Sequence, residues 1–364
     1  MRESNKISTN QIRALVVSTI VGVGILSLPN EVAVFLGKDG WIAIIIGGLL
    51  MAAGIVIINK LFELYPDKDF FEIGEEVLGK WIFNIFLIFV FSYLVALMSS
   101  VARNLAEILK AFLLETTPTE IMIITFVLAT SYIARSEIQI IGRAAYLIYP
   151  VILGFIIFLI FVSLPNSDFT NILPVFQSSM KGLPKSIEVS FFSYLGFEIL
   201  LFSIPFVEER EKTLKASLTG IGIVIAMYVI IFILCLSQYG IHHLQRQTFP
   251  TLSIIKEIDL PGYFIENLDG LVMAIWVLIV FATMASTYYS AGKVLSKLFI
   301  TRDHSLFIIP LLPIVYIVSL IPQNIIEVNK QLGTFINYSG LVSIFILPIL
   351  IYCIGYIKLR WKRR

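Results

Sequence analysis

Long, almost uncharged apolar segments constrain the fold of this chain more than any other feature. In hydrocarbon every backbone amide and carbonyl needs a partner within the protein, so such segments must be helices. The alternating ten-residue strands of a membrane barrel are absent from the sequence. We therefore predict an all-α polytopic membrane protein with about ten transmembrane helices, forming a single domain over residues 1–364. The apolar runs occupy residues 11–36, 41–64, 81–113, 119–135, 138–164, 185–207, 213–239, 264–299, 304–321 and 332–357.

The composition supports a chain whose solvent is mostly lipid. Hydrophobic residues make up 58% and charged residues 14%, whereas soluble domains have about 45–50% and about 25%. A net charge of +2 gives no basis for nucleic-acid binding. Cys235 and Cys353 lie in apolar runs, and His242 and His243 have no nearby Cys or carboxylate, so neither metal nor cofactor is expected. Without a nucleophile–base set or a nucleotide-binding loop, an enzyme is not expected.

The distribution of basic residues predicts the orientation in the membrane. If the N-terminus is cytoplasmic, that side collects nineteen of the 27 lysines and arginines, including the tail from Lys358 to Arg364. Cytoplasmic connections of membrane proteins carry such an excess. We therefore expect an even number of spans with both termini in the cytoplasm.

Two halves of the chain share a weak internal symmetry. Runs one and six are both interrupted by glycine, and runs three and eight are both unusually long. This pattern predicts an inverted five-plus-five repeat, with one half at about 11–164 and the other at about 185–357. Transporter folds with such repeats bind their ligand near the midplane, where broken helices of the two halves meet.

The first candidate break lies in run one, at Gly22 and Gly24. Pro29 follows Gly24 by five residues. Glycine costs about 1 kcal/mol in a helix interior and proline about 3. Unwinding here would free backbone amides and carbonyls, and the start of the second half-helix would favour a carboxylate. The alternative is that both glycines only allow neighbouring helices to pack closely.

The second candidate break lies in run six, where Gly196 stands two residues before Glu198 in an apolar stretch. A charged group at this depth costs a few kcal/mol, so it usually faces a cavity or a partner. Glu198 could bind a ligand amine or take up a proton. It could equally be a structural group bonded to a neighbouring helix.

Hydroxyl groups form a stripe on run eight, at spacings of three and four that place them on one helical face. They belong to Thr283, Ser286, Thr287 and Ser290. Tyr93 gives a weaker signal on run three. Hydrogen bonding between helices explains such stripes as well as a binding site does. Near the end of run three, Arg103 and Glu107 have the spacing of a local ion pair.

Several short strings, taken in order, resemble the B subunit of the nutrient germinant receptors of bacterial endospores. This is the spore permease family within the amino acid–polyamine–organocation superfamily. The resemblance covers nearly the whole chain. The strings are Lys6-Ile7-Ser8-Thr9-Asn10-Gln11, Ile25-Leu26-Ser27-Leu28-Pro29, Tyr65-Pro66-Asp67-Lys68, Leu78-Gly79-Lys80-Trp81, Thr117-Pro118, Asn171-Ile172-Leu173-Pro174-Val175, Phe249-Pro250-Thr251-Leu252-Ser253 and Glu266-Asn267-Leu268-Asp269.

The resemblance implies a leucine-transporter-type fold and a small nutrient ligand, with an amino acid expected. It also implies residence in the spore inner membrane, together with an A subunit and a lipoprotein C subunit. The pocket is then expected at the two breaks, with runs three and eight closing its sides. Its expected residues are Gly22, Val23, Gly24, Ile25, Tyr93, Tyr194, Gly196, Phe197, Glu198 and Thr287.

The resulting hypothesis is a membrane subunit that senses a germinant. The nutrient binds between the broken helices and shifts the conformation, and the altered state passes to partner subunits. A secondary amino-acid transporter, coupled to protons or sodium, is the alternative, with Glu198 as a candidate proton site. A purely structural scaffold for the complex is a third reading.

Overall fold

The computed structural model describes residues 6–256 and 268–362 of this multi-pass membrane protein. All regular elements in these ranges are helices. One isolated β-bridge pairs Ile7 with Val207. Within the described residues, six helical segments are long and apolar enough to cross a membrane, and two further apolar helices are shorter. Of the string Glu266-Asn267-Leu268-Asp269, the first two residues lie outside the described residues. The basic residues Arg2, Arg363 and Arg364 lie outside them as well.

The predicted runs correspond to the helices within a few residues. Seven runs each form one helix, whereas runs one and six are broken and run ten contains two π-helical segments. Two short helices, α4 and α11, lie between spans. The helices are α1 (Thr9–Ile20), α2 (Gly24–Leu36), α3 (Gly40–Leu64), α4 (Phe70–Leu78), α5 (Lys80–Phe112), α6 (Thr119–Ala134), α7 (Ile138–Ser163), α8 (Leu183–Ser193), α9 (Ile199–Ser203), α10 (Arg210–Leu244), α11 (Pro250–Lys256), α12 (Leu268–Leu298), α13 (Ser305–Leu320), α14 (Ile325–Glu327), α15 (Thr334–Gly340) and α16 (Leu347–Lys362), with the π-helical segments at Val328–Gly333 and Leu341–Ile346.

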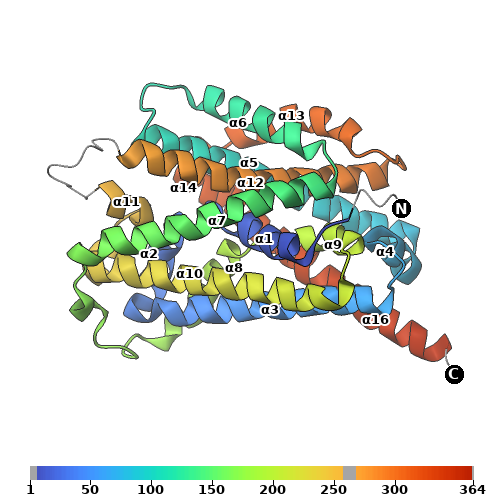
Figure 1. Ribbon diagram of the computed structural model, residues 1–364, viewed down its shortest axis with the longest axis horizontal. Coiled ribbons are helices and arrows are strands. Elements are labelled where there is room, and N and C mark those ends of the chain that lie inside the picture. Colours follow the sequence, from blue (N-terminus) through green and yellow to red (C-terminus); the bar gives the residue numbers. More distant parts are fainter. Residues whose placement is uncertain (1–5, 257–267, 363–364) are drawn as a thin grey trace.

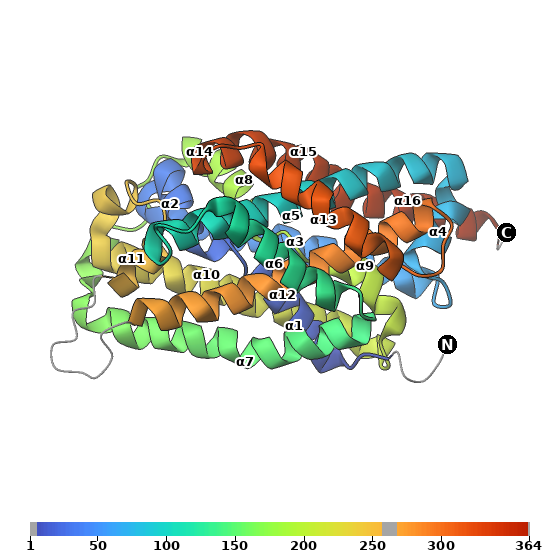
Figure 2. The ribbon, with the colours of Figure 1, turned by 90° about the horizontal axis from the view of Figure 1, so that it is seen from above.

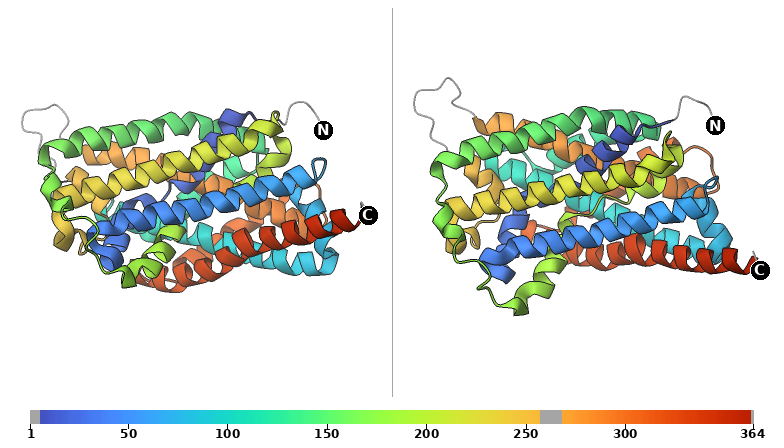
Figure 3. Two further views of the ribbon diagram at one scale, coloured as in Figure 1. Left: turned by 90° about the horizontal axis from the view of Figure 1, so that it is seen from below. Right: turned by 60° about the horizontal axis from the view of Figure 1, so that its bottom comes forward.

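The spans lie roughly side by side, with α1 and α8 inside the bundle (Figures 1 and 2). Helices α3, α10 and α7 follow one another across one side (Figure 3), whereas α6 and α13 cover the opposite side over α5 and α12. Helix α1 begins and α16 ends at the same end of the bundle, near α4. Helices α11 and α14 mark the other end (Figure 1). An even number of crossings produces this arrangement. The cytoplasmic placement of that end and the repeat boundaries stay predictions.

Apolar side chains cover much of the outside of the bundle. Trp81 is 86% exposed, Leu147 is 73% exposed and Phe161 is 70% exposed. Large apolar surfaces of this kind would aggregate in water, and they suit a protein whose outer face contacts lipid. Many hydroxyl groups of the spans instead lie inside, and Ser99 and Thr283 are among the buried ones.

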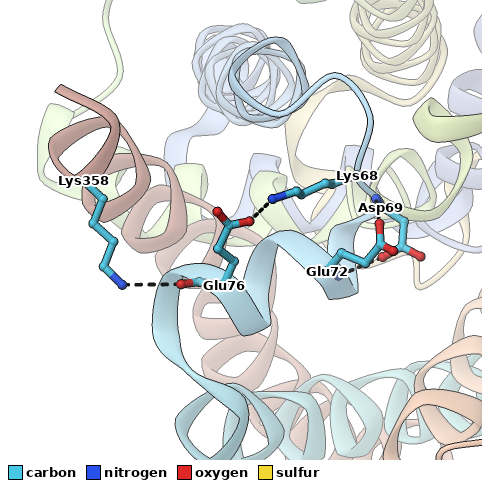
Figure 4. Close-up of polar contacts among 5 residues, drawn as sticks. All are labelled: Lys68, Asp69, Glu72, Glu76 and Lys358. Carbon is cyan, nitrogen blue, oxygen red and sulfur yellow. Dashed lines mark hydrogen bonds and ion pairs between the residues drawn. The ribbon is translucent and has the colours of Figure 1, made fainter. Parts of the chain in front are cut away.

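The short helix α4 is fixed at both of its ends (Figure 4). At its start, the Asp69 carboxylate accepts the Glu72 amide at 2.8 Å, and the Glu72 carboxylate accepts the Asp69 amide at 2.9 Å. This reciprocal capping box satisfies amides that a helix start leaves unpaired. At its end, the Lys358 ammonium of α16 donates to the carbonyls of Glu76 and Val77. Helix α4 is therefore attached to the last span.

Candidate functional site

Run one is interrupted as the sequence predicts. Helix α1 ends at Ile20, Val21 has non-helical torsion angles, and α2 begins at Gly24. No side chain caps the start of α2. In its first turn the Leu26 amide donates to the Val23 carbonyl at 3.1 Å. The amides of Gly24 and Ile25 have no such partner among the described residues and, with the helix dipole, favour a negative charge.

Run six is interrupted at the matching place. Helix α8 ends at Ser193, a series of turns follows, and α9 begins at Ile199. Gly196 has a φ of +123°, a conformation that side-chain-bearing residues rarely adopt. A Cβ atom at this position would lie 2.6 Å from the carbonyl oxygen of Thr19. Glycine is thus required here for both its conformation and its close approach to α1.

The two interruptions face each other. A Cβ atom on Gly24 would lie 3.0 Å from the Cα of Ser193, so the start of α2 touches the end of α8. The Tyr228 hydroxyl of α10 donates to the Ser193 carbonyl at 2.8 Å and lies 3.2 Å from the Ile20 carbonyl. One buried hydroxyl therefore lies within hydrogen-bonding distance of a carbonyl from each broken span. Because each break supplies free polar groups to the same region, the region is suited to binding a small polar molecule.

A cavity of about 470 Å³ opens at these interruptions. Its walls come from both broken runs, from α5, from α12 and from the last run. The lining residues are Ile20, Gly22, Val23, Gly24, Ser27, Glu31, Leu97, Ser100, Val101, Asn104, Lys185, Glu188, Val189, Phe192, Ser193, Leu195, Thr283, Asn329, Gly333, Thr334, Ile336, Asn337 and Tyr338. This volume is within the range typical of small-molecule sites.

Charged groups stand at one part of the cavity wall. The Lys185 ammonium and the Glu188 carboxylate pair with each other at 2.8 Å. The Glu31 carboxylate makes no ion pair among the described residues and lies beside the Ser27 hydroxyl, one turn earlier on α2. These groups lie on the part of α2 beyond the break and on the first two turns of α8. Near the breaks, by contrast, Ile20, Val23 and other apolar side chains line the wall.

Three of the predicted site residues line this cavity, namely Gly22, Val23 and Gly24. The other seven do not belong to its lining, and all of them are buried. Their binding role stays a prediction. The seven are Ile25, Tyr93, Tyr194, Gly196, Phe197, Glu198 and Thr287.

Both oxygens of the Glu198 carboxylate are occupied by protein partners. Oε1 accepts the Tyr93 hydroxyl at 2.9 Å, and Oε2 accepts the Gly196 amide at 2.8 Å. Glu198 is 5% exposed and Tyr93 is fully buried. Of the readings open at the sequence level, these contacts support a structural group that joins the second break to α5.

Several cavity residues were not singled out by the sequence, notably Glu31, Asn104 and Asn337. Glu31 lies nine residues after Gly22, so a carboxylate on the second half of a broken span was a usable signal. Asn104 and Asn337 belong to different spans, and only their packing brings them to one cavity. The polar stripe of α12 contributes Thr283, whose hydroxyl donates to the Ser18 carbonyl at 3.2 Å. Thr287 instead bonds within its own helix.

The predicted ion pair between Arg103 and Glu107 is confirmed. The Arg103 guanidinium approaches the Glu107 carboxylate to 2.7 Å. It also donates to the Gln323 carbonyl at 2.8 Å, so it connects the end of α5 to the chain after α13.

Comparison with known proteins identifies close parallels in sequence and fold. The family model for "Spore germination protein" matches residues 6–328. Spore germination protein YndE of Bacillus subtilis is 28% identical over 362 residues, covering 99% of this chain and 98% of that protein. Spore germination protein A2 of the same organism is also 28% identical, covering 98% of this chain and 97% of the relative.

Among solved structures, a sodium-coupled sialic acid symporter in its outward-open state superimposes with a TM-score of 0.69. It is 10% identical in sequence, and the match covers 95% of this chain and 80% of the symporter. At this identity the likeness concerns the fold alone. The chain thus has the leucine-transporter-type fold, with its first and sixth spans broken.

Proposed function

The chain belongs to the spore germination protein family, and we propose that it is the nutrient-sensing membrane subunit of a spore germination receptor. The cavity between the two interrupted spans carries this proposal, because it gives a small ligand access to groups from both halves of the fold. The proposal includes an A subunit and a lipoprotein C subunit as partners, and residence in the spore inner membrane.

An amino acid suits the chemistry of the cavity. Its carboxylate would lie at the uncapped start of α2, beside Gly24, where the helix dipole and free amides stabilise a negative charge. Its side chain would contact apolar residues such as Val23 and Phe192. In this position the ligand touches α2 and α8 together, so it can favour one arrangement of the two broken spans over another.

Glu31 is placed for a different contact. It follows Gly24 by seven residues, which corresponds to about 10 Å along a helix axis. The ammonium of an α-amino acid lies much closer than this to its own carboxylate. We therefore assign Glu31 to the cavity entrance, where it attracts cationic groups, and not to the bound ammonium.

A secondary transporter is the second candidate, because the fold is shared with a sodium-coupled symporter. The same cavity would then expose its ligand alternately to the two sides of the membrane. Binding without net movement supports the sensor, whereas accumulation of ligand inside vesicles supports the transporter.

Thermal unfolding of the detergent-purified full chain tests binding directly. We expect one or more members of a panel of amino acids, sugars and nucleosides to raise the melting temperature, since a ligand at 100 times its Kd adds about 2.7 kcal/mol of stability. Gly24→Ala places a methyl group against Ser193 and should remove this shift. Gly222→Ala is the matched control, because its new methyl group meets no neighbour.

Two further outcomes separate the alternatives. Ligand accumulation in proteoliposomes driven by a proton or sodium gradient, with the purified chain alone, would replace the sensor by the transporter. If no panel member stabilises the chain and Gly24→Ala leaves the germination response of spores intact, the cavity has no role and the subunit is a scaffold.

A further inference from the structure

A second cavity lies at the end of the bundle where α5 begins and α12 ends. It has a volume of about 360 Å³ and is separate from the cavity between the broken spans. The segment joining α12 to α13 forms one wall, and the end of α4 and the first turns of α5 form the other. The lining residues are Glu75, Lys80, Asn84, Ser296, Lys297, Ile300, Thr301 and Arg302.

This second cavity has an excess of positive charge. Lys297 pairs with Glu75 at 2.8 Å, so these two charges compensate each other. Lys80 and Arg302 form no ion pair and no hydrogen bond with any described residue, which leaves two uncompensated cations in one small space. The start of α5 has no side-chain cap, so its dipole adds to the positive potential.

Exposed apolar residues adjoin the same cavity. Ile300, which lines it, is 77% exposed, and its neighbour Phe299 is 65% exposed. Trp81, next to Lys80, is 86% exposed, as expected for an aromatic residue at the edge of a bilayer. A stripe of exposed apolar side chains continues from there along α5, formed by Ile82, Ile85, Ile88 and Phe89.

We propose that this cavity binds the headgroup phosphate of an anionic phospholipid. Lys80 and Arg302 would contact the phosphate, and the acyl chains would lie along the exposed stripe of α5. Basic pockets of membrane proteins bind anionic headgroups in this way. A free phosphate ion would use the two cations alone, whereas a lipid also uses the apolar surface that adjoins them. The geometry therefore favours the lipid.

The location gives such a lipid a structural consequence. Glu75, in the same cavity, belongs to α4, and α4 packs through Phe70 and Phe71 on Phe202 of the broken span, with ring centroids 6.0 Å and 5.8 Å apart. A lipid that joins α5 to the end of α12 therefore holds the elements around α4 together.

The test uses the detergent-purified full chain titrated with dioleoylphosphatidylglycerol or with dioleoylphosphatidylcholine. We expect the glycerol lipid to raise the melting temperature and to be retained in native mass spectra, while the choline lipid does neither. The double variant Lys80→Gln with Arg302→Gln should weaken the apparent affinity for the glycerol lipid at least about tenfold. The control, Lys60→Gln with Arg360→Gln, removes the same charge outside the cavity and should bind as the unmodified chain does.

Two results would overturn the proposal. One is equal retention of the glycerol lipid by the double variant and the unmodified chain. The other is equal stabilisation by inorganic phosphate at the same concentration, which would assign the cavity to a free anion. If the double variant does not fold, quenching of Trp81 fluorescence by brominated phosphatidylglycerol, taken as the difference between the unmodified chain and Trp81→Phe, decides the matter. Quenching no stronger than with brominated phosphatidylcholine would refute the site.

Discussion

The Tyr93 hydroxyl donates a 2.9 Å hydrogen bond to the carboxylate of Glu198 in the interior of the bundle. Tyr93 lies on α5, and Glu198 directly precedes α9, the second half of the broken sixth span. Because the other oxygen of Glu198 accepts the Gly196 amide, the carboxylate holds the turn at the break against α5.

Replacing Tyr93 by Phe tests this contact. The change removes one hydrogen bond from a buried carboxylate, which costs about 1–3 kcal/mol. We expect a lower melting temperature of the detergent-purified chain. Tyr146→Phe is the control, because Tyr146 is 49% exposed and its hydroxyl forms no hydrogen bond with any described residue. An unchanged melting temperature for Tyr93→Phe would show that Glu198 does not depend on this bond.

Gly196→Ala should destabilise the protein more than a Gly→Ala substitution within an ordinary helix does. The new residue would adopt a φ of +123° and place its Cβ 2.6 Å from the Thr19 carbonyl oxygen. Strained backbone of this kind costs about 1–3 kcal/mol. We expect lower thermal stability and loss of nutrient-induced stabilisation. The same substitution at Gly222, an exposed position in α10, should be neutral or slightly stabilising. Equal behaviour of the two variants would contradict the close approach at the break.

Lys358→Met should loosen α4 without removing the apolar stem of the side chain. The ammonium donates to the Val77 carbonyl at 2.8 Å, and a hydrogen bond of this kind contributes about 0.5–1.5 kcal/mol. Hydrogen exchange of the amides in residues 70–78 should accelerate by roughly three- to tenfold. Arg360→Met, two residues later on α16, serves as the control and should leave exchange in α4 unchanged.

His304, in the connection before α13, should make the stability depend on pH. Burial lowers the pKa of this imidazole from its usual value of 6.5, the nearby Lys293 lowers it further, and Glu137 opposes the change. In the window between the folded-state pKa and 6.5, the unfolded chain binds more protons than the folded chain. Stability therefore rises with pH across this window and is lost as the pH falls from 6.5.

Melting temperatures measured from pH 5 to pH 8 check the effect of His304. His304→Gln should flatten the slope below pH 6.5, because Gln carries no titrating group at that position. His243→Gln changes an exposed imidazole in the last turn of α10 and provides the comparison. A slope unaffected by His304→Gln would assign the pH dependence to other groups.

The sequence determined the class of the fold and the position of its breaks. Apolar runs of the length of a bilayer must be helices in lipid, whatever packs beside them. Gly22, Gly24 and Gly196 lie at the interruptions because glycine is locally unfavourable in a helix and tolerates unusual torsion angles. These are properties of neighbouring residues along the chain, so they are readable without a structure.

The tertiary structure decided which side chains line the cavity. Glu198 stands out in the sequence as a carboxylate deep in an apolar span, yet its two oxygens are already bonded to Tyr93 and Gly196. Asn104 and Asn337 line the cavity although no local pattern marks them. The direction in which a polar side chain points depends on the rotation and tilt of its helix against its neighbours. That orientation is set by packing among residues that are far apart in the chain.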